Sequence, residues 1–519
     1  MKSLRRDEWA ALILFLALAL GAFIRFAPAS LAGFPINDGG MFAVMIEDLK
    51  TSHYLLPFYT TYNSLNLPFA YPPLGFYLGR LTADLFQLST VEVMRWLPAL
   101  FASLSIPAFY LLALRLMKTR LHAATATLFF ALMPRAFSWF VEGGGVTRSP
   151  AQFFMLLTLF FVLRLYAENR RPDILGAGFF GALTVMSHPE AAVHTTVSAL
   201  FFWLMLGRSR RSFLNSIFVA LLVLLFAAPW WVTVISRHGV APFLAAAQTG
   251  QKLLAILHLV FFSFTEEIYA TLIAVLGLLG LGFYLVKRDY LLPLWLVLPF
   301  IVEGRGAAAP AAIPLALLAA SALLDLILPA FRTLRGLDSA SEQVSGVERS
   351  VFIYLLAYLL FSAYLFAWQV SAVTLYPPDR EAMRWVQRET QPGARFLVLS
   401  GSRSPSYDAV PEWFPALAQR PSLFTVQGSE WTLGKDFGAF VDRAVAVQAC
   451  VSESVECLLR LAPPSSFDYL YLSKVLRSDN FRPLGYPQTF PYFAESLRAD
   501  PRFRLVYETE GVVIYQVRH

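Results

Sequence analysis

The sequence carries little charge. Only 15% of its 519 residues are Asp, Glu, Lys or Arg, against roughly 25% in an average soluble protein. Hydrophobic residues make up 57% of the chain, and the mean hydropathy is +0.56. This composition excludes a soluble globular protein and indicates an integral membrane protein. The net charge of +7 does not indicate a nucleic-acid partner, because no basic stripe or nucleic-acid-binding module is present.

The apolar runs divide into about eleven segments of the length that a membrane-spanning helix needs, roughly 20 residues. We place these spans near residues 9–27, 91–116, 121–140, 150–166, 173–188, 191–207, 213–236, 268–286, 290–303, 307–328 and 351–372. The first span resembles a signal peptide. Because its apolar stretch is long enough to cross a bilayer, we interpret it as an uncleaved helix.

Basic residues cluster in alternate loops between the predicted spans. The main pairs are Lys118 with Arg120, Arg170 with Arg171, Arg210 with Arg211, and Lys287 with Arg288. Cytoplasmic loops are enriched in Lys and Arg, so we expect these loops and the N-terminus in the cytoplasm and the chain in the plasma membrane. The acidic residues near span ends then gather on the outer face, which indicates an active site at a membrane surface.

The sequence predicts two domains. Residues 1–372 form a transmembrane domain with a large outer loop, residues 28–90, in which segments 41–49 and 74–86 are expected to be helices lying on the membrane. Residues 373–519 are richer in polar residues and form an extracytoplasmic α/β domain. Its pattern predicts a helix at 380–389 and strands near 395–401, 467–473 and 505–517.

The first candidate site residue is Asp38, in the sequence FPINDGG just after the first span. Gly39 and Gly40 leave the backbone around it open. A carboxylate at a membrane surface can act as a general base or bind a divalent cation. The alternative interpretation is that Asp38 caps the helix that starts near Gly40.

The second candidate is Glu142, which precedes three glycines and Arg148 in the sequence VEGGGVTRSP. Such a loop can bring backbone N–H groups close to a phosphate. It is not a nucleotide-binding P-loop, because no Gly-Lys-Ser/Thr follows. The alternative interpretation is a flexible connector.

Three further groups of ionisable residues lie at predicted span ends. They are His188 and Glu190, followed by His194; Glu266 and Glu267; and Glu303 with Arg305. Ionisable residues near the hydrocarbon are costly and indicate function. An Arg there suits a phosphate. The alternatives are a hydrogen bond from His194 to a neighbouring helix and an ion pair between Glu303 and Arg305.

Two other features have structural and functional interpretations. Tyr71, Pro72 and Pro73 precede the helix at 74–86 and either line a groove for a lipid chain or form an ordinary turn. Cys450 and Cys457 would be about 10 Å apart on one straight helix, too far for a disulfide. A break near residues 452–454 would allow the bond.

The pattern resembles the GT-C membrane glycosyltransferases, which include oligosaccharyltransferases, protein O-mannosyltransferases and aminoarabinose transferases. The matching features are an acid soon after the first span (Asp38), a Pro-Pro-Leu element at the end of a large first loop (Pro72 to Leu74), a second acid (Glu142) and an outer C-terminal domain. The WWDYG sequence of oligosaccharyltransferases is absent, and residues 412–420 and 426–431 occupy a comparable place.

The resemblance implies a transfer of sugar from a polyprenyl-phosphate donor to an acceptor at the outer face. Asp38 would be the catalytic base or a metal ligand, with Glu142 beside it. Arg305, with Arg148, would hold the donor phosphate. A divalent cation, Mg²⁺ or Mn²⁺, would have Asp38, Glu142 and His188 as ligands. The residues that position the acceptor or the cation would be His188, Glu190, Glu266 and Glu267.

Two other functional classes are compatible with a polytopic membrane protein. A transporter or lipid flippase would have polar residues near the bilayer midplane and internal repeats, and the sequence shows neither. A non-catalytic protein would use its outer domain to bind a partner, and replacement of Asp38 would then have no effect.

Overall fold

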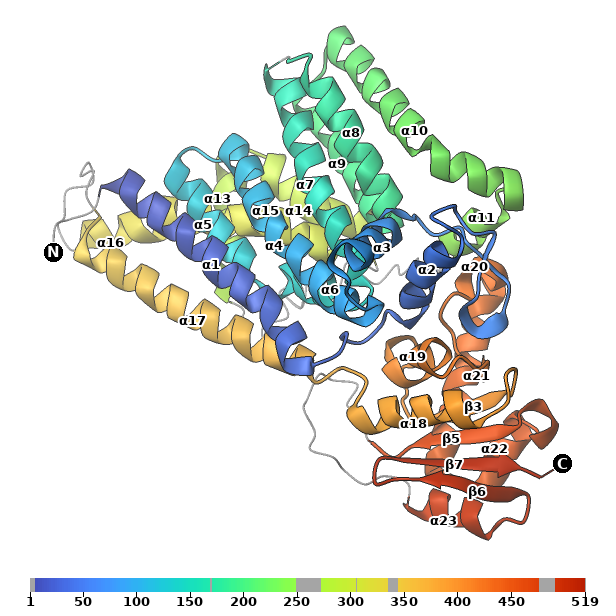
Figure 1. Cartoon of the computed structure of the whole chain (residues 1–519). Helices are drawn as coiled ribbons and strands as arrows, with labels where there is room; N and C mark the ends of the chain where they lie inside the picture. The colour runs from blue at the N-terminus through green and yellow to red at the C-terminus, as the bar shows by residue number, and fades with distance from the viewer. Residues whose placement is uncertain are drawn as a thin grey trace.

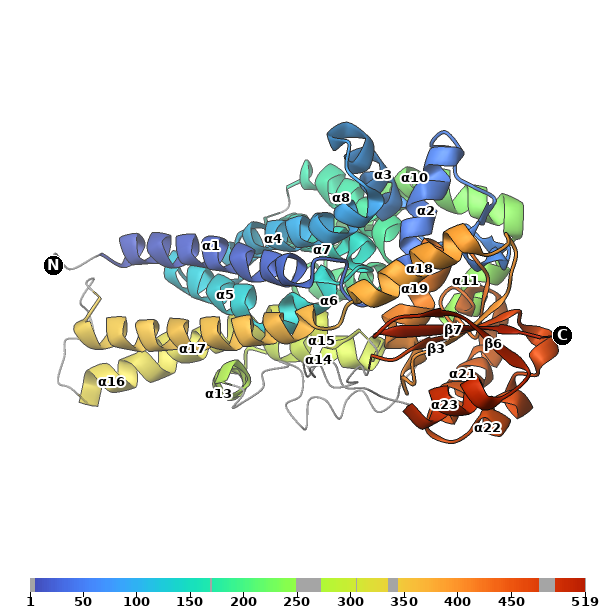
Figure 2. The same cartoon turned by 60° about the horizontal axis from the view of Figure 1, so that its bottom comes forward.

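The computed structural model describes residues 5–168, 170–248, 272–304, 306–334, 344–475 and 491–518. Figure 1 shows a bundle of long helices and a C-terminal part in which helices cover a β-sheet. The N-terminus lies at one end of the bundle, and the C-terminal part lies at the other (Figures 1 and 2).

The bundle and its outer loop contain sixteen named helices among the described residues. They are α1 (Arg6–Ala32), α2 (Gly40–Thr51), α3 (Leu74–Phe86), α4 (Thr90–Leu116), α5 (Arg120–Leu132), α6 (Ser138–Val141), α7 (Gly145–Glu168), α8 (Asp173–Ser187), α9 (Pro189–Leu206), α10 (Arg210–His238), α11 (Ala241–Ala247), α13 (Leu272–Val286), α14 (Leu291–Val302), α15 (Ala308–Ser321), α16 (Leu328–Leu334) and α17 (Gly346–Ser371). A two-stranded ribbon, β1 (Tyr59–Thr60) with β2 (Leu67–Pro68), lies between α2 and α3.

Among the described residues, six helical segments are long and apolar enough to cross a membrane, and a seventh is added if the bent segment 120–141 is one span. The chain is therefore a multi-pass membrane protein, as predicted. The α8, α13 and α14 helices are apolar but shorter. The total of eleven spans and the orientation of the termini stay predictions.

The predicted span at 121–140 is not one straight helix. The chain bends by 84° after α5, where Met133 is extended and Pro134 follows. Proline disfavours helical geometry in the residue before it, which explains the break. Arg25 of α1, fully buried, donates from Nη1 to the carbonyl of Ala131 (2.6 Å) in the last turn of α5. A cation there satisfies a carbonyl that has lost its helical partner.

The C-terminal part contains a five-stranded sheet with strand order β4-β3-β5-β7-β6. Its elements are α18 (Pro377–Glu389), β3 (Phe396–Leu399), α19 (Ala409–Ala418), β4 (Ser422–Leu423), α20 (Glu430–Leu433), α21 (Phe437–Ala449), α22 (Val455–Leu461), β5 (Tyr469–Ser473), α23 (Pro491–Ala499), β6 (Phe503–Glu508) and β7 (Val512–Val517). The β3 strand pairs in parallel with β4 and β5, and β7 pairs antiparallel with β5 and β6.

Both faces of this sheet are covered by helices. Side chains alternate between the two faces of a strand, and β3 follows this rule. Phe396 and Val398 pack in one apolar cluster with residues of α18 and α19, while Leu397 and Leu399 pack in another with residues of α21 and α22. A disulfide joins Cys450 to Cys457. The helix breaks between α21 and α22, which is the condition that we set for this bond.

The outer loop joins the bundle to the C-terminal part. We expected residues 41–49 to lie on the membrane as an amphipathic helix, but α2 packs against α3, α4 and α19 instead. Along α2 only Glu47, Lys50 and Thr51 are exposed. The predicted helix at 74–86 coincides with α3, which keeps several large apolar side chains exposed, as a helix on the membrane surface would.

Candidate active site

The loop that carries Asp38 is fixed by backbone hydrogen bonds on both sides. Asn37 N–H donates to the carbonyl of Val373 (2.6 Å), just after α17, and Gly143 N–H donates to the carbonyl of Ile36 (2.8 Å). Asn37 itself has φ 54°, a left-handed conformation that Asn adopts more readily than most residues. The residue before α2 is Gly39, and no side chain caps this helix. The interpretation of Asp38 as a helix cap is therefore wrong.

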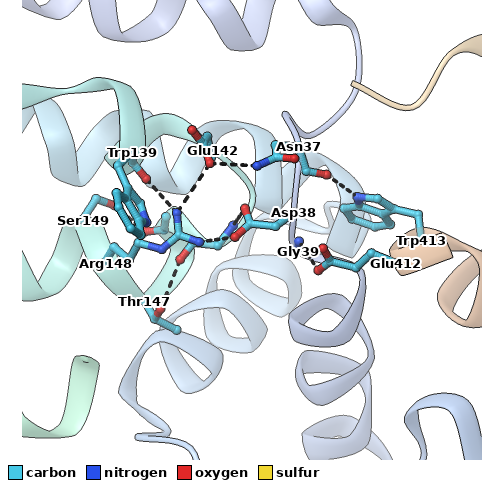
Figure 3. Close-up of polar contacts among 12 residues, drawn as sticks. Asn37, Asp38, Gly39, Trp139, Glu142, Thr147, Arg148, Ser149, Glu412 and Trp413 are labelled. Atoms are coloured by element: carbon cyan, nitrogen blue, oxygen red, sulfur yellow. Dashed lines mark hydrogen bonds and ion pairs between the residues drawn. The ribbon is translucent and has the colours of Figure 1, made fainter. Parts of the chain in front are cut away.

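Arg148 lies between two carboxylates (Figure 3). Its Nη2 atom contacts Asp38 Oδ2, and its Nη1 atom lies 3.6 Å from Glu142 Oε2. Nη1 also donates to the carbonyl of Trp139 (3.0 Å), and the guanidinium lies over the Trp139 ring at 5.1 Å. We expected Arg148 to hold the donor phosphate. Both Nη atoms contact protein oxygens in this structure, and a contact between Arg148 and the donor phosphate stays a prediction.

Backbone and amide groups complete the contacts of these carboxylates. Asp38 Oδ1 accepts from Gly144 N–H (2.7 Å), and Glu142 Oε2 accepts from the Asn37 side-chain amide (3.1 Å). Glu142 thus connects the Asp38 loop to Arg148. The catalytic role that the sequence suggested for Glu142 stays a prediction.

The glycines between α6 and α7 are required by close packing. A Cβ on Gly143 would lie 1.8 Å from the carbonyl oxygen of Asp38, and one on Gly144 would lie 2.5 Å from Asp38 Oδ2. Both distances are well below any real contact of a Cβ atom, so only glycine allows this approach. The segment is therefore a packed part of the site and not a flexible connector.

The C-terminal part supplies a third carboxylate, Glu412 of α19. Gly39 N–H donates to Glu412 Oε1 (2.7 Å), and the indole N–H of Trp413 donates to the carbonyl of Asn37 (3.1 Å) (Figure 3). Glu412 is only 3% exposed. Burial, and next the charge of Asp38, raise the pKa of Glu412 well above its ordinary value of 4.5. Glu412 is thus favoured in its neutral form.

Sequence reasoning noted the segment 412–420 but gave Glu412 no role. The available signal was the expectation that this segment lies in a place comparable to the WWDYG sequence of oligosaccharyltransferases. Glu412 and Gly39 are 373 residues apart. No local pattern shows that α19 would reach the Asp38 loop.

A pocket on the other side of Arg148 brings together more of the predicted residues. It is lined by Arg148 and Trp139, by His188 and Glu190 at the start of α9, and by Gly306 before α15. His194, one turn further along α9, also lines the pocket. Its Nε2 atom lies 3.7 Å from Oε2 of Glu303. Three of the motifs singled out in the sequence therefore meet at one place.

Tyr71 borders this region. Its ring lies 6.2 Å from that of His188 and 5.7 Å from that of Trp431, and its hydroxyl is 3.5 Å from Thr147 Oγ1. Pro72 and Pro73 are buried in the outer loop. A groove for a lipid chain at these three residues stays a prediction. Glu266, Glu267 and Arg305 lie outside the described residues.

The proposed metal ligands do not form a cation site. The guanidinium of Arg148 lies between Asp38 and Glu142, and a cation there would face a fixed positive charge. In the part of the chain that the structure describes, no three His, Cys, Asp or Glu side chains are grouped to hold a metal. Asp38, Glu142 and His188 therefore do not fit the predicted metal, and we derive no step through it.

The three carboxylates differ in exposure. The side chains of Glu142 and Asp38 are 12% and 20% exposed, and Glu412 is almost completely buried. Asp38 is thus the one that solvent or a substrate reaches most easily. An ionised carboxylate oxygen has two lone pairs. Asp38 can therefore accept a further proton while it holds Arg148 and Gly144.

Comparison with known proteins agrees with this architecture. Residues 70–233 match the family described as dolichyl-phosphate-mannose-protein mannosyltransferase. No curated protein matches the chain at a significant level. The family match covers the end of the outer loop, the Glu142 segment and the pocket helix α9.

Several solved structures share the fold. The archaeal oligosaccharyltransferase AglB from Archaeoglobus fulgidus, solved with an inhibitory peptide and a dolichol-phosphate, is 15% identical with a TM-score of 0.57, over 90% of this chain and 69% of that one. Another structure of the same enzyme is a complex with Zn and sulfate.

Two bacterial proteins are similar to the same degree. ArnT from Cupriavidus metallidurans, solved with undecaprenyl phosphate, is 16% identical with a TM-score of 0.55, over 98% of both chains. The arabinofuranosyltransferase AftD from Mycobacteria is 17% identical with a TM-score of 0.57, over 99% of this chain but 40% of its own length. The similarity to ArnT extends over the full length of both chains.

Proposed function

We propose that the chain transfers a sugar from a polyprenyl-phosphate donor to an acceptor at the membrane face where Asp38 lies. The ground for this proposal is that the chain belongs to the GT-C superfamily of membrane glycosyltransferases. Asp38 acts as the general base. The observation that carries this proposal is the arrangement at Arg148. Of the three carboxylates gathered there, Asp38 is the most exposed, and its two oxygens are oriented by Arg148 and Gly144.

The proposed reaction is a single displacement. Asp38 accepts the proton of the acceptor hydroxyl as its oxygen attacks the anomeric carbon of the sugar. The bond between that carbon and the phosphate oxygen breaks, and the polyprenyl phosphate leaves with the electron pair. The configuration at the anomeric carbon is inverted, because attack and departure occur on opposite faces.

The pocket beyond Arg148 is the proposed place for the donor headgroup. His188 and Glu190 line it and can hydrogen-bond sugar hydroxyls. Arg305 is the proposed phosphate contact. The support for this proposal is that Gly306, the next residue in the sequence, lines the same pocket.

Glu142 and Glu412 are positioning residues in this proposal. Glu142 bonds Asn37 and faces Arg148, and Glu412 accepts from Gly39. Each therefore bonds a residue adjacent to Asp38 in the chain. Small displacements of a catalytic group cost large factors in rate, so these contacts are expected to matter for turnover.

The test is a transfer assay on the full chain purified in detergent. A panel of radiolabelled polyprenyl-phosphate sugars is offered to wild type and to Asp38→Asn. We expect label to leave the lipid with wild type, and the rate with Asp38→Asn to fall by roughly 10²–10⁴-fold. Asp84→Asn is a matched control, since Asp84 also contacts an arginine, Arg80, but on the surface of α3.

Two outcomes would count against the proposal. Near-normal transfer by Asp38→Asn would reject Asp38 as the base. Release from no donor, together with no donor binding, would reject the transferase and favour transport or a structural role. A parallel lane with a chelator tests the cation, because loss of transfer that Mg²⁺ or Mn²⁺ restores would show a metal requirement.

A further inference from the structure

A second cavity is lined by the first residues of α1 and α5 and by residues of α16 and α17, and Figures 1 and 2 show that the start of α1 lies at the end of the bundle away from the C-terminal part. It has a volume of about 490 Å³ and is enclosed by the first turns of α1, α5 and α17 and by α16. The 27 residues of α1 separate it from the Asp38 loop, which corresponds to about 40 Å. No residue of the candidate active site contributes to it.

The charged groups of this cavity are mainly cationic. Four arginines line it, against two carboxylates: Arg5, Arg6, Arg120 and Arg332, with Asp7 and Glu348. Arg332 is held by Glu348 through Nε (3.1 Å) and Nη2 (2.8 Å). Arg6 and Arg120 are exposed at the cavity. Arg5 is exposed as well, so the cavity has an excess of positive charge with three arginines accessible from solvent.

Two of the three exposed arginines occupy positions that a helix does not favour for cations. Arg6 and Arg120 are the first residues of α1 and α5. The positive end of the helix dipole lies there and is stabilised by anions, not by cations. The dipoles of these two helices act beside the groups already present there, the Thr119 cap of α5 and the acidic Asp7 and Glu8 of α1. Arginine side chains and helix termini thus favour the same kind of ligand.

The interior of the cavity is apolar. Trp9, Leu328 and Phe352 line it and are buried. Trp9 is 9% exposed, and its indole N–H has no hydrogen-bond partner among the described residues. This cavity suits a ligand with an anionic head and an apolar tail. The head would contact the cationic groups that solvent reaches, and the tail would contact the buried apolar side chains. A free phosphate ion would use only the first of these features.

We propose that this cavity binds the phosphate headgroup of an anionic phospholipid, with Arg6 and Arg120 as its main contacts. Basic pockets between transmembrane helices have the chemistry that such headgroups need. Arginines at span ends also set the orientation of a membrane protein. Setting the orientation requires no cavity. Arginines at other helix starts, which do not line this cavity, therefore serve as a control that distinguishes orientation from lipid binding.

The probe is dioleoyl phosphatidylglycerol added to the full chain in detergent, with binding measured by native mass spectrometry and by the shift in melting temperature. Dioleoyl phosphatidylcholine and inorganic phosphate are the comparison ligands. Arg6→Gln/Arg120→Gln should weaken phosphatidylglycerol binding by roughly 30-fold, which is about 5-fold for each arginine. The control, Arg210→Gln/Arg211→Gln, changes exposed arginines at the start of α10 that do not line the cavity.

The expected result is binding of phosphatidylglycerol that is lost in the first variant and kept in the control. The variant melting temperature without lipid checks that it is folded, since a neutral residue at these helix starts should not destabilise them. Equal binding of phosphatidylcholine, or equal losses in the two variants, would overturn the proposal. Inorganic phosphate that binds as tightly as the lipid would overturn the assignment to a lipid.

Discussion

The two ends of the helix bundle hold ionisable residues in opposite proportions. At one end two carboxylates, Asp38 and Glu142, contact the guanidinium of Arg148, and a third acidic side chain, Glu412, is bonded to Gly39 N–H next to Asp38. At the other end four arginines and two carboxylates line a cavity. The sign of the excess charge differs, and so does what each end can receive. The first can take up a proton, and the second can bind an anion.

The ends also differ in how they are assembled. The contacts of Asp38 join segments that are 106 and 110 residues apart, and Glu412 reaches Gly39 over 373 residues. At the opposite end, Arg332 and Glu348 are only 16 residues apart. The first end therefore depends on the docking of the C-terminal part, while the second is formed within the helix bundle, where Lys118 and His122 also reach Asp325 over 207 and 203 residues. Substitutions should affect activity at the first end, and loss of the Arg332–Glu348 pair should affect stability at the second.

Among these substitutions, the largest effect on the transfer rate is expected for Gly143→Ala. It prevents the close approach of residue 143 to the backbone of Asp38. The added Cβ would lie 1.8 Å from the carbonyl oxygen of Asp38, so the loop must move. A displacement of this order should lower the transfer rate by at least about 100-fold. The measurement is transfer per folded protein. Gly438→Ala is the control, because nothing lies within 4 Å of its Cβ, and full activity is expected of it.

A substitution at the other end should produce the reverse pattern. Arg332→Ala leaves Glu348 buried without its cation, because their side chains are only 6% and 10% exposed. Removing one partner of a buried pair costs on the order of 3 kcal/mol, while transfer by the folded fraction should stay near wild type. Thermal unfolding and the transfer assay measure the two effects. Loss of transfer at normal stability would contradict the division between the ends.

Glu412 tests whether the C-terminal part belongs to the active end. Glu412→Ala removes the acceptor of the Gly39 N–H, and we expect a roughly 10- to 100-fold fall in turnover through displacement of Asp38. Glu412→Gln keeps an acceptor oxygen and should restore most of the rate. An alanine variant with normal turnover would show that docking of α19 is structural only.

A smaller effect is expected in the pH dependence of stability. The raised pKa of Glu412 means that the folded state favours its protonated form. That stabilisation is complete below about pH 4.5 and is lost as the pH rises through the raised value. Glu412→Gln removes this group, so its melting temperature should fall less than that of wild type between pH 5 and pH 8. Parallel curves for the two proteins would show that Glu412 does not titrate in this way.

The sequence predicted what local patterns can show. The helix at 74–86 and the strands near 395–401, 467–473 and 505–517 follow from apolar spacing, and the structure has α3, β3, β5 and the β6–β7 pair there. Asp38, Glu142 and His188 stood out because ionisable groups are rare in apolar sequence.

The partners of these residues did not follow from the sequence. Arg148 was expected to hold a phosphate because the sequence around it does not reveal its partner. In the fold, Asp38, which is 110 residues away in the chain, contacts Arg148. Glu412 was missed for the same reason. The break after α5 could have been predicted from Pro134. The sequence on both sides of Pro134 is apolar, and we therefore interpreted residues 121–140 as one continuous span.

The central claim is that Asp38 performs the chemistry and Glu142 only positions it. The most direct measurement compares the single-turnover transfer rates of Asp38→Asn and Glu142→Gln, each corrected for the folded fraction. We predict a loss of roughly 10²–10⁴-fold for Asp38→Asn and a loss of about tenfold for Glu142→Gln, which keeps an amide oxygen to accept from Asn37. Equal losses in the two variants, or a near-normal rate for Asp38→Asn, would contradict the account.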